Sequence, residues 1–394
     1  MRLLFAHDHR FIPLGNNIFS ESQFDSNLWT RYLNHFEKVI VVARQGCLPE
    51  HKKQDDLVLS SRENVAFNFI PNLSSIKSQV LKRYEARQLM QTYVSDVDAV
   101  IARLPSEIGL LAINTAVKQN KTWAVEVAGC PWDGLWNYGT WQGKFYAPAK
   151  YYRVKRAVAK APYALYVTSE FLQRRYPCKH GQIVNCSNVE IPSPSENILQ
   201  QRIERIHSSQ KKIILGLIGT LRGKFKGIQT VLASLSQIRN DLPHFEFHIL
   251  GGGSSKKWQE LASAYGLSDV VFFDGVLPGG DPVFEWLDNV DIYLQPSFKE
   301  GLPRALIEAM SRGCPSIASN VAGIPELLEE TNLINPGNVK QLSELLVQSA
   351  NDRNWMLQQA QRNWQHSVNY SNHILETRRN VFWGEFAEYA ASCS

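Results

Sequence analysis

Two glutamates that lie eight positions apart, Glu300 and Glu308, have the surroundings in this 394-residue chain that most favour chemistry. Glu300 lies in a short polar loop after an apolar run, which predicts a buried strand ending near Leu294. Glu308 lies among apolar residues of a helix predicted for residues 304–311, where burying an unpaired carboxylate is costly. Pro303 suits the start of this helix because its φ is already helical and its missing N–H is not needed there.

The start of this helix suits a phosphate, because the first N–H groups of a helix are unpaired and its dipole is positive there. A second strand, residues 315–319, leads to another helix that we expect to begin at Pro325, so two such helix starts lie at one sheet edge. Glu308 stands roughly 7 to 8 Å along the axis from Pro303, where its carboxylate can accept from both hydroxyls of a ribose. The alternative is a solvated helix glutamate.

The stretch EGLPRALIEAMSRGCPSIASNVAGIPELL, residues 300–328, resembles the glutamate-x7-glutamate motif of retaining glycosyltransferases of family 4. The resemblance implies an α/β protein of two Rossmann-like, doubly wound domains that face each other across a cleft (GT-B). It also implies transfer of a sugar from a nucleotide-diphosphate sugar to a hydroxyl acceptor with retained anomeric configuration. In such enzymes the glutamate at the position of Glu300 binds the hydroxyls of the donor sugar. Gly301, Leu302, Pro303 and Arg304 would lie at the diphosphate, and Glu308 at the ribose.

A second candidate site is the glycine-rich, basic loop after the strand predicted for residues 211–216. Glycines allow close backbone approach, and three basic side chains in a strand-to-helix loop suit a diphosphate. The loop resembles the family's glycine and Lys-Gly element, in which Gly219 and Lys226 match. Thr220 stands where the family commonly has an arginine, so Arg222 or Lys224 would take that role. Further on, the family's nucleotide base lies beside the position of Val276.

Length predicts two domains, because 394 residues exceed one ordinary core. Linker composition after Ile191 places the boundary near residue 195. We therefore predict an amino-terminal acceptor-binding domain (1–195), a nucleotide-sugar-binding domain (196–367) and a last helix (368–394) that crosses back to the first domain. The apolar content of 44%, the lack of a signal sequence or membrane span, and six cysteines without a C-x-x-C pair favour a reduced cytoplasmic protein.

Positive charge is concentrated in the amino-terminal half. Residues 1–200 have 24 Lys+Arg against 17 Asp+Glu, a net +7, whereas the rest of the chain has a net −2. This asymmetry indicates an anionic partner, either a membrane surface or a phosphorylated acceptor. The basic, aromatic helix predicted for residues 144–160 either lies on the inner face of an anionic membrane or is a solvated helix. We expect a glycan or lipid-linked acceptor and no nucleic-acid partner.

Candidate acceptor contacts follow the predicted strands of the first domain, because ligands bind outside the carboxyl ends of strands in open α/β sheets. Asp8 and His9 follow a strand predicted for residues 2–6, Arg103 follows residues 99–102, and Glu126 lies in the strand of residues 123–128. The aromatic segment 129–138, with Asp133 for a hydroxyl, suits the stacking of a sugar ring. Loop histidines bonded to backbone and a packed surface loop are the alternatives. A helix is also predicted for residues 21–35.

No metal ion or other cofactor is expected besides the sugar nucleotide as co-substrate. Two aspartate pairs, Asp96/Asp98 and Asp288/Asp291, each precede a predicted strand and so lie at the edge opposite the ligands. Two other functions remain open. A sugar-nucleotide epimerase of similar architecture would need a proton-transfer set such as His7, His9 and Glu126. A non-catalytic nucleotide-sugar binding protein would be expected to lack some of Glu300, Lys226 and Glu308.

Overall fold

The structure of the protein is a computed structural model that describes residues 1–21, 24–48, 53–54, 57–73, 78, 81–136, 141–208 and 212–393. The chain divides into two compact units. The first unit comprises Met1–Trp132, Lys144–Cys186 and Glu376–Ser394, and the second comprises Asp133–Gly143 and Ser187–Leu375. Each is described by itself.

The second unit is built on a parallel sheet in the order β12-β11-β10-β13-β14-β15. Numbered along the chain, this order is 3-2-1-4-5-6, the doubly wound order in which ligands bind where the winding reverses. That switch point lies between β10 and β13. The strands are β10 (Ile213–Ile218), β11 (Phe245–Leu250), β12 (Val271–Gly275), β13 (Ile292–Gln295), β14 (Ser316–Ser319) and β15 (Leu333–Ile334).

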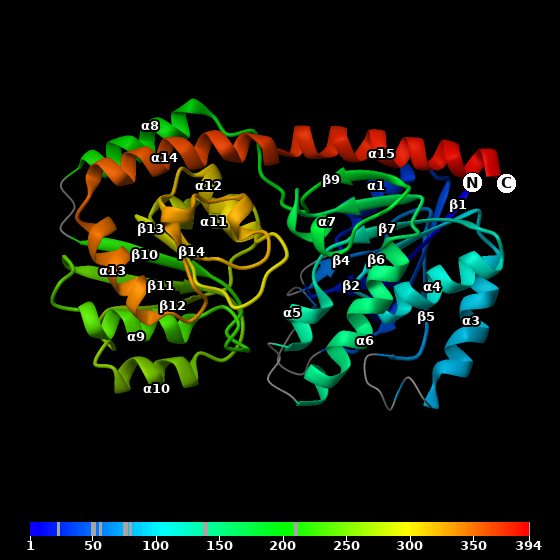
Figure 1. Cartoon of the computed structure of the whole chain (residues 1–394), viewed down its shortest axis with the longest axis horizontal. Coiled ribbons are helices and arrows are strands. Elements are labelled where there is room, and N and C mark those ends of the chain that lie inside the picture. Colours follow the sequence, from blue (N-terminus) through cyan, green and yellow to red (C-terminus); the bar gives the residue numbers. More distant parts are fainter. Residues whose placement is uncertain are drawn as a thin grey trace. The chain divides into compact units, whose positions relative to one another are not determined.

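Helices cover both faces of this sheet, as a parallel sheet requires (Figure 1). Helix α9 packs against α10 and α13 on one face, and α12 packs against α14, which packs against α8, on the other. The helices are α8 (Glu196–His207), α9 (Ile228–Ile238), α10 (Lys256–Ala264), α11 (Asp281–Asp288), α12 (Arg304–Ser311), α13 (Val339–Ala350) and α14 (Arg353–Ser367). The core between them is apolar, with Phe247, Ile292 and Leu235 fully buried.

The first unit repeats this winding. Its parallel strands run in the order β5-β3-β1-β6-β7-β8-β9, and β2 and β4 extend the sheet through antiparallel pairs beside β1. The strands are β1 (Arg2–Leu14), β2 (Asn17–Ser20), β3 (Lys38–Gln45), β4 (Val58–Leu59), β5 (Val65–Phe69), β6 (Ala99–Leu104), β7 (Thr122–Val127), β8 (Tyr163–Tyr166) and β9 (Gln182–Asn185).

The helices of the first unit include the carboxyl-terminal segment of the chain. They are α1 (Thr30–Leu33), α3 (Arg83–Ser95), α4 (Glu107–Lys118), α5 (Pro131–Trp136), α6 (Trp141–Val158), α7 (Phe171–Arg175) and α15 (Asn372–Cys393), of which α5, α6 and α15 begin or end in segments grouped with the second unit. Within this unit, α15 packs its aromatic residues on the sheet and α1. Trp383 is fully buried with its ring centroid 5.9 Å from that of Tyr32, and Phe386 lies 5.4 Å from Tyr163.

Four predicted elements are corrected by the structure. Strand β1 does not end at residue 6: it shifts register between Ala6 and Arg10 and continues into a hairpin with β2, turned at Gly15 with φ +60°. The helix predicted for residues 21–35 is short in its described part, a 3₁₀ turn Ser26–Trp29 capped by Asp25, followed by α1. The predicted loop 129–138 contains α5, and the helix predicted from Pro325 is a single 3₁₀ turn, Ile324–Glu326.

In the parts of the chain that the structure describes, none of the helices has the length and apolarity that crossing a bilayer requires.

Candidate active site

Two loops of the second unit meet at its switch point, one after β10 and one after β13. The β13 loop carries Glu300 and the β10 loop carries Lys226, whose Nζ lies 2.6 Å from Oε1 of Glu300. Both side chains are mostly buried, with 19% of Lys226 and 11% of Glu300 exposed. A hydrogen bond from the Phe298 amide to the Phe225 carbonyl, at 2.8 Å, ties the two loops together. The structure thus brings together two predicted site residues from distant segments.

A buried polar network fixes the Glu300 carboxylate. Its Oε1 atom also accepts hydrogen bonds from Nε2 of Gln295 at 2.8 Å and from Oγ of Ser297 at 2.7 Å. The Tyr293 hydroxyl in turn donates to Oε1 of Gln295 at 2.7 Å. Oε2 of Glu300 accepts no hydrogen bond from any described residue, so it is open to a ligand hydroxyl. Charge-assisted bonds of this kind hold a carboxylate in one orientation before a ligand arrives.

Tyr293, Gln295 and Ser297 were not predicted as site residues. All three side chains are buried, with at most 1% exposed. A signal was available: they alternate along the end of a strand, and side chains at period two point to the same face. Hydroxyl and amide groups on one face of an otherwise apolar strand need hydrogen-bond partners. Here the partner is the carboxylate of Glu300, which follows the strand.

Glycines allow the two loops to approach. A Cβ on Gly219 would lie 2.8 Å from Cγ of Lys226, so this position must be a glycine for the lysine to pass beside it. Gly227 has φ +76°, and a Cβ there would lie 1.9 Å from the carbonyl oxygen of Pro296. The Lys-Gly pair is therefore required geometrically: Lys226 carries the charge, and Gly227 lets α9 begin directly against the end of β13.

Helix α12 presents an uncapped start next to Glu300. Pro303 is the N-cap residue, with φ −73° and ψ 111°, and makes no side-chain capping bond, so Arg304 is the first helical residue. The helix therefore has its predicted bounds, with Pro303 directly before its first residue. The first N–H groups of α12 remain available to an anion. Gly301 and Leu302 precede them, and the Gly301 carbonyl accepts from the Gly323 amide at 2.9 Å.

Glu308 is a mostly buried carboxylate that forms no hydrogen bond or ion pair with any described residue. Burial raises the pKa of Glu308 above its ordinary value; the Glu190 carboxylate adds to this rise, and the nearby Arg304 charge opposes it. Its neighbours Leu306, Ile307, Ala309 and Met310 are buried. An ionised carboxylate in such surroundings costs free energy unless a ligand satisfies it.

The other predicted donor residues lie around the glycine turns that follow β10, β11 and β12. Oγ1 of Thr220 donates to the Gly252 carbonyl at 3.2 Å and accepts from the Arg222 amide at 3.3 Å. The Arg222 side chain is exposed and passes Gly253. Val276 is 71% exposed, beside Gly252. An exposed apolar side chain next to open backbone suits the face of a base. Arg222 is not part of the Lys226–Glu300 network.

In the first unit, three predicted acceptor residues gather around Phe24. The His9 ring packs against the Phe24 ring in a tilted contact, with 4.7 Å between the centroids, and shares a hydrogen bond of 2.7 Å with Oγ of Ser20. The Arg103 guanidinium lies over the same ring at 5.2 Å, and one of its nitrogens lies 3.7 Å from Oε2 of Glu126. Oε1 of Glu126 accepts from the buried Tyr32 hydroxyl at 2.6 Å. Because the residues come from β1, β6 and β7, the sheet itself positions them.

The charges of this cluster favour neutral histidines. Burial and the nearby Arg44 and Arg103 lower the pKa of His9 to about 4. The pKa of His7 is also lowered well below its ordinary value, chiefly by burial and next by the Arg103 charge. Both rings are therefore uncharged near pH 7, and His9 serves as a hydrogen-bonding group to Ser20. As bases they are weak.

Asp8 has a structural partner. Its carboxylate accepts from the backbone amides of Glu107 at 2.8 Å and Ile108 at 3.0 Å, so it occupies the start of α4. Ser106 caps the same helix by accepting from the Gly109 amide at 2.8 Å. The start of α4 is thus already satisfied and holds no open anion site.

The aromatic segment is described only in part. Asp133 lies in the first turn of α5, between Trp132 and the half-exposed Trp136, and contacts group it with the second unit. Asn137 and Tyr138 lie outside the described residues. His9, Arg103 and Glu126 belong to the first unit instead.

Each aspartate pair precedes a strand, and three of the four carboxylates have partners. Asp98 accepts from the Arg2 amide at 2.6 Å, and Asp291 accepts from the Ile214 amide at 2.7 Å and pairs with Arg205 at 2.8 Å. Asp288 pairs with Arg312 at 2.6 Å.

Comparisons with known proteins agree with this geometry. A family model described as glycosyl transferases group 1 matches residues 212–352, the sheet that carries Lys226 and Glu300. Protein CapJ of Staphylococcus aureus is 31% identical over 352 residues, which cover 89% of this chain and 86% of CapJ. The putative colanic acid biosynthesis glycosyltransferase WcaL of Escherichia coli is 35% identical over 111 residues, 26% of this chain and 27% of WcaL.

Solved structures match over the whole chain. Sucrose-phosphate synthase from Thermosynechococcus elongatus is similar with a TM-score of 0.67 and 16% identity, covering 100% of both chains. HepE from Anabaena, solved in complex with UDP and glucose, has a TM-score of 0.62 and 13% identity, covering 100% of this chain and 99% of HepE. At such identities the likeness shows the fold alone, and it confirms the predicted GT-B fold class.

Proposed function

The chain belongs to the group 1 glycosyltransferases, and from this premise we propose that it transfers a sugar from a nucleotide-diphosphate sugar to a hydroxyl acceptor with retained anomeric configuration. The observation that carries the proposal is Glu308. It is a mostly buried carboxylate without a partner among the described residues, on the helix that follows the fixed carboxylate Glu300. HepE, which shares the fold, was solved in complex with UDP-glucose, and this supports a nucleotide-sugar donor.

The donor binds the second unit in this proposal. Its diphosphate lies between the uncapped start of α12 and the cations Lys226 and Arg222, where backbone N–H groups and positive charge favour it. Its ribose hydroxyls donate to Glu308, whose unfavourable burial this contact relieves. Oε2 of Glu300 accepts from hydroxyls of the donor sugar. Gly219, Thr220 and Val276 border the nucleotide.

The reaction breaks the bond between the anomeric carbon and the diphosphate oxygen, and that oxygen takes the bonding electrons. Lys226 and Arg222 stabilise the negative charge that grows on this oxygen. Such preorganised electrostatic stabilisation is the largest contribution to the rate enhancement of many enzymes. The acceptor oxygen attacks the anomeric carbon from the same face as the leaving group, so configuration is retained. Its proton passes to an oxygen of the departing diphosphate. No protein nucleophile is required, and Glu300 positions the sugar.

Two finer proposals concern the acceptor. The acceptor is a glycan or lipid-linked sugar, as the names of WcaL and of the amylovoran biosynthesis glycosyltransferase AmsK suggest for their own pathways. His9, Arg103, Glu126 and Asp133 contact it. An Asp133→Ala variant should then raise the acceptor KM or lower kcat while donor affinity stays within about twofold, because sites without shared contacts respond separately.

A further proposal concerns an anionic membrane. In α6, Phe145 is 79% exposed and Tyr152 is 68% exposed, and Arg156 is exposed on the same helix. Exposed aromatic and basic side chains together suit the interface of a bilayer. Cosedimentation with vesicles of phosphatidylglycerol, weakened in a Phe145→Ser/Tyr152→Ser variant, tests this contact.

A metal ion is not needed in this proposal, because Lys226, Arg222 and the α12 start already offset the diphosphate charge. A chelator that abolishes turnover, with recovery on adding manganese or magnesium, would contradict it.

The decisive experiment measures free nucleotide diphosphate release from candidate sugar nucleotides with and without acceptor. Transfer predicts steady release only when acceptor is added, and NMR of the product then reports its anomeric configuration. An epimerase would convert the donor without acceptor. It is not favoured, since the neutral His7 and His9 and the paired Glu126 form a poor proton-transfer set. A binding protein would release nothing.

A further inference from the structure

A basic pocket lies in the first unit, apart from the residues assigned above to the donor and the acceptor. It encloses about 160 Å³ between α3 and α4, with one wall from α6. Two side-chain stripes form its walls. Arg83, Arg87 and Gln91 recur every four residues on α3, and Leu111, Asn114, Thr115 and Lys118 recur at three- and four-residue steps on α4. Such spacing places each set on one face of its helix.

The pocket has an excess of positive charge. Four cations line it, Arg83, Arg87, Lys118 and Arg153, against one carboxylate, Glu107. That carboxylate is already compensated: it lies 2.9 Å from Nη1 of Arg153 and 3.5 Å from Nζ of Lys150, and it accepts from the Tyr146 hydroxyl at 3.0 Å. Glu107 therefore adds no net negative charge to offset the other cations.

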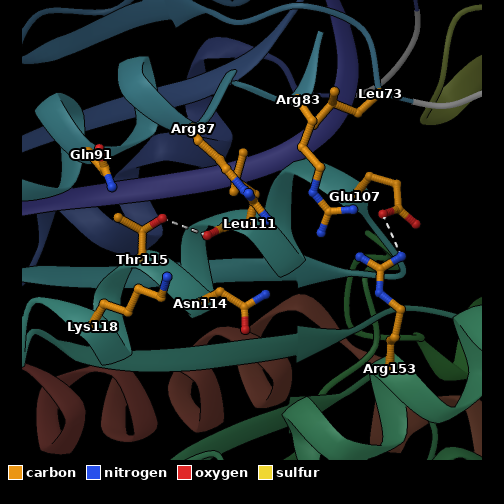
Figure 2. Close-up of a pocket in the computed structure, with 10 residues that line it drawn as sticks. All are labelled: Leu73, Arg83, Arg87, Gln91, Glu107, Leu111, Asn114, Thr115, Lys118 and Arg153. Atoms are coloured by element: carbon orange, nitrogen blue, oxygen red, sulfur yellow. Dashed lines mark hydrogen bonds and ion pairs between the residues drawn. The ribbon is translucent and has the colours of Figure 1, made fainter. Parts of the chain in front are cut away.

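Arg83, Arg87 and Lys118 have no ion-pair partner in the described part of the chain. Figure 2 shows the side chains of Arg83 and Arg87 entering the pocket from α3, with Arg153 approaching from the other side beside Glu107. Arg83 and Arg87 stand roughly 6 Å apart along the helix axis. Like charges held this close repel one another, and an anion that lies between them converts this repulsion into attraction.

We propose that the Arg83, Arg87 and Lys118 pocket binds the phosphoryl group of a phosphate- or diphosphate-bearing ligand. Guanidinium groups present forks of N–H donors that match the oxygens of a phosphate, and a phosphate dianion offsets more of the excess charge than a single carboxylate does. The side-chain amides of Gln91 and Asn114 border the pocket as neutral donors. The same chemistry is offered by a soluble diphosphate and by a phospholipid headgroup.

The first arm of the test is calorimetric titration of the full chain with inorganic pyrophosphate. It is done in a Lys226→Ala background, to remove the main cation of the donor site. Arg83→Gln/Arg87→Gln should weaken binding at least tenfold, because two charged donors are lost. Arg174→Gln is the matched control: it removes an exposed arginine of the same unit that neither lines the pocket nor lies on α6, and affinity should stay within twofold. Circular dichroism verifies that the exposed substitutions leave the fold intact.

The second arm distinguishes the two sources. Vesicles of phosphatidylglycerol in phosphatidylcholine are sedimented with the wild type, the Arg83→Gln/Arg87→Gln variant and Arg174→Gln. A loss confined to Arg83→Gln/Arg87→Gln identifies a lipid headgroup, whereas loss of pyrophosphate binding alone identifies a soluble phosphate. If that variant equals Arg174→Gln in both arms, the proposal is overturned. Both arms measure binding only, so their result does not depend on sugar transfer.

Discussion

Nζ of Lys226 and Oε1 of Glu300 lie 2.6 Å apart, although 74 positions separate the two residues in the chain. The pair joins the loop after β10 to the loop after β13, at the point where the winding of the sheet reverses. Glu300 is held by two further donors, Gln295 and Ser297, so it does not depend on Lys226 alone for its orientation. Lys226 is therefore free to turn its charge toward a diphosphate without loosening the carboxylate.

We predict that Lys226→Ala acts mainly on the chemical step. The diphosphate charge grows as the glycosidic bond breaks, so a preorganised cation stabilises the transition state more than the bound donor, and roughly a 100-fold loss of kcat is expected. Turnover at saturating donor is the measurement. Lys340→Ala removes an exposed lysine of the same unit, 3.8 Å from Glu344, and should leave kcat unchanged. If kcat falls less than threefold in Lys226→Ala, another residue stabilises the leaving diphosphate.

Glu308→Gln should weaken donor binding and stabilise the protein without donor. A carboxylate that accepts from two ribose hydroxyls is replaced by an amide with one acceptor oxygen. Because hydrogen bonds to charged groups are worth roughly 1.5 to 3 kcal/mol, we expect donor affinity to fall about tenfold or more. Calorimetric titration with the matched nucleotide sugar measures it, with the exposed Glu344→Gln as the control.

The gain in stability follows from the direction of the Glu308 pKa shift. Burial raises this pKa, so the ionised side chain is less favourable in the folded state than in the unfolded chain. That penalty is fully present above the folded pKa and vanishes below the unfolded one. Scanning calorimetry without donor should therefore give Glu308→Gln a higher Tm than wild type at pH 7, and the difference should shrink as the pH falls toward 4. Equal Tm values at pH 7 would mean that Glu308 carries no burial penalty.

Donor affinity should also depend on pH through Glu308. Since its pKa is raised above 4.5, acidification protonates it at a higher pH than it would a solvated glutamate, and one acceptor site is lost. Titrations of a nucleotide sugar between pH 5 and 8 should show weaker binding at the acid end for wild type and a flatter profile for Glu308→Gln. His9 does not add to this profile above pH 5, since its pKa lies at about 4. The same slope in both proteins would exclude Glu308 as its source.

The sequence predicted elements best where one pattern dominates. The helix at residues 304–311 is found with the predicted bounds, because its apolar residues follow a clear period, and the strand predicted for residues 315–319 is found at Ser316–Ser319. The extension of β1 was not predictable in this way. The extension depends on a register shift and on pairing with β2. Polar residues such as His7 and His9 are typical of a loop when only their neighbours in the sequence are considered.

The main residues of the candidate site could be predicted from the sequence, but the contacts between them could not. Lys226, Glu300 and Glu308 were each assigned from the sequence, whereas the contact between Lys226 and Glu300 depends on the pairing of β10 with β13, which local patterns do not encode. Gln295 and Ser297 were assigned to the end of a strand and their side chains overlooked. Their role becomes visible only once the carboxylate they bind is placed.

Gly227 supports a last prediction, which separates backbone strain from the geometry of the site. Gly227 and Gly266 both have positive φ, +76° and +67°, where an L side chain costs roughly 1 to 2 kcal/mol. A Cβ on Gly266 meets nothing within 4 Å, but on Gly227 it lies 1.9 Å from the Pro296 carbonyl oxygen, so the β10 and β13 loops must move apart. Urea unfolding should show a loss of unfolding free energy near that conformational cost for Gly266→Ala and a clearly larger loss for Gly227→Ala.

Transfer activity under folding conditions should fall for Gly227→Ala alone, because Lys226 moves with its neighbour while Glu300 remains bound to Gln295 and Ser297. Equal losses of stability and activity in the two variants would show that the close approach of the loops does not position the lysine.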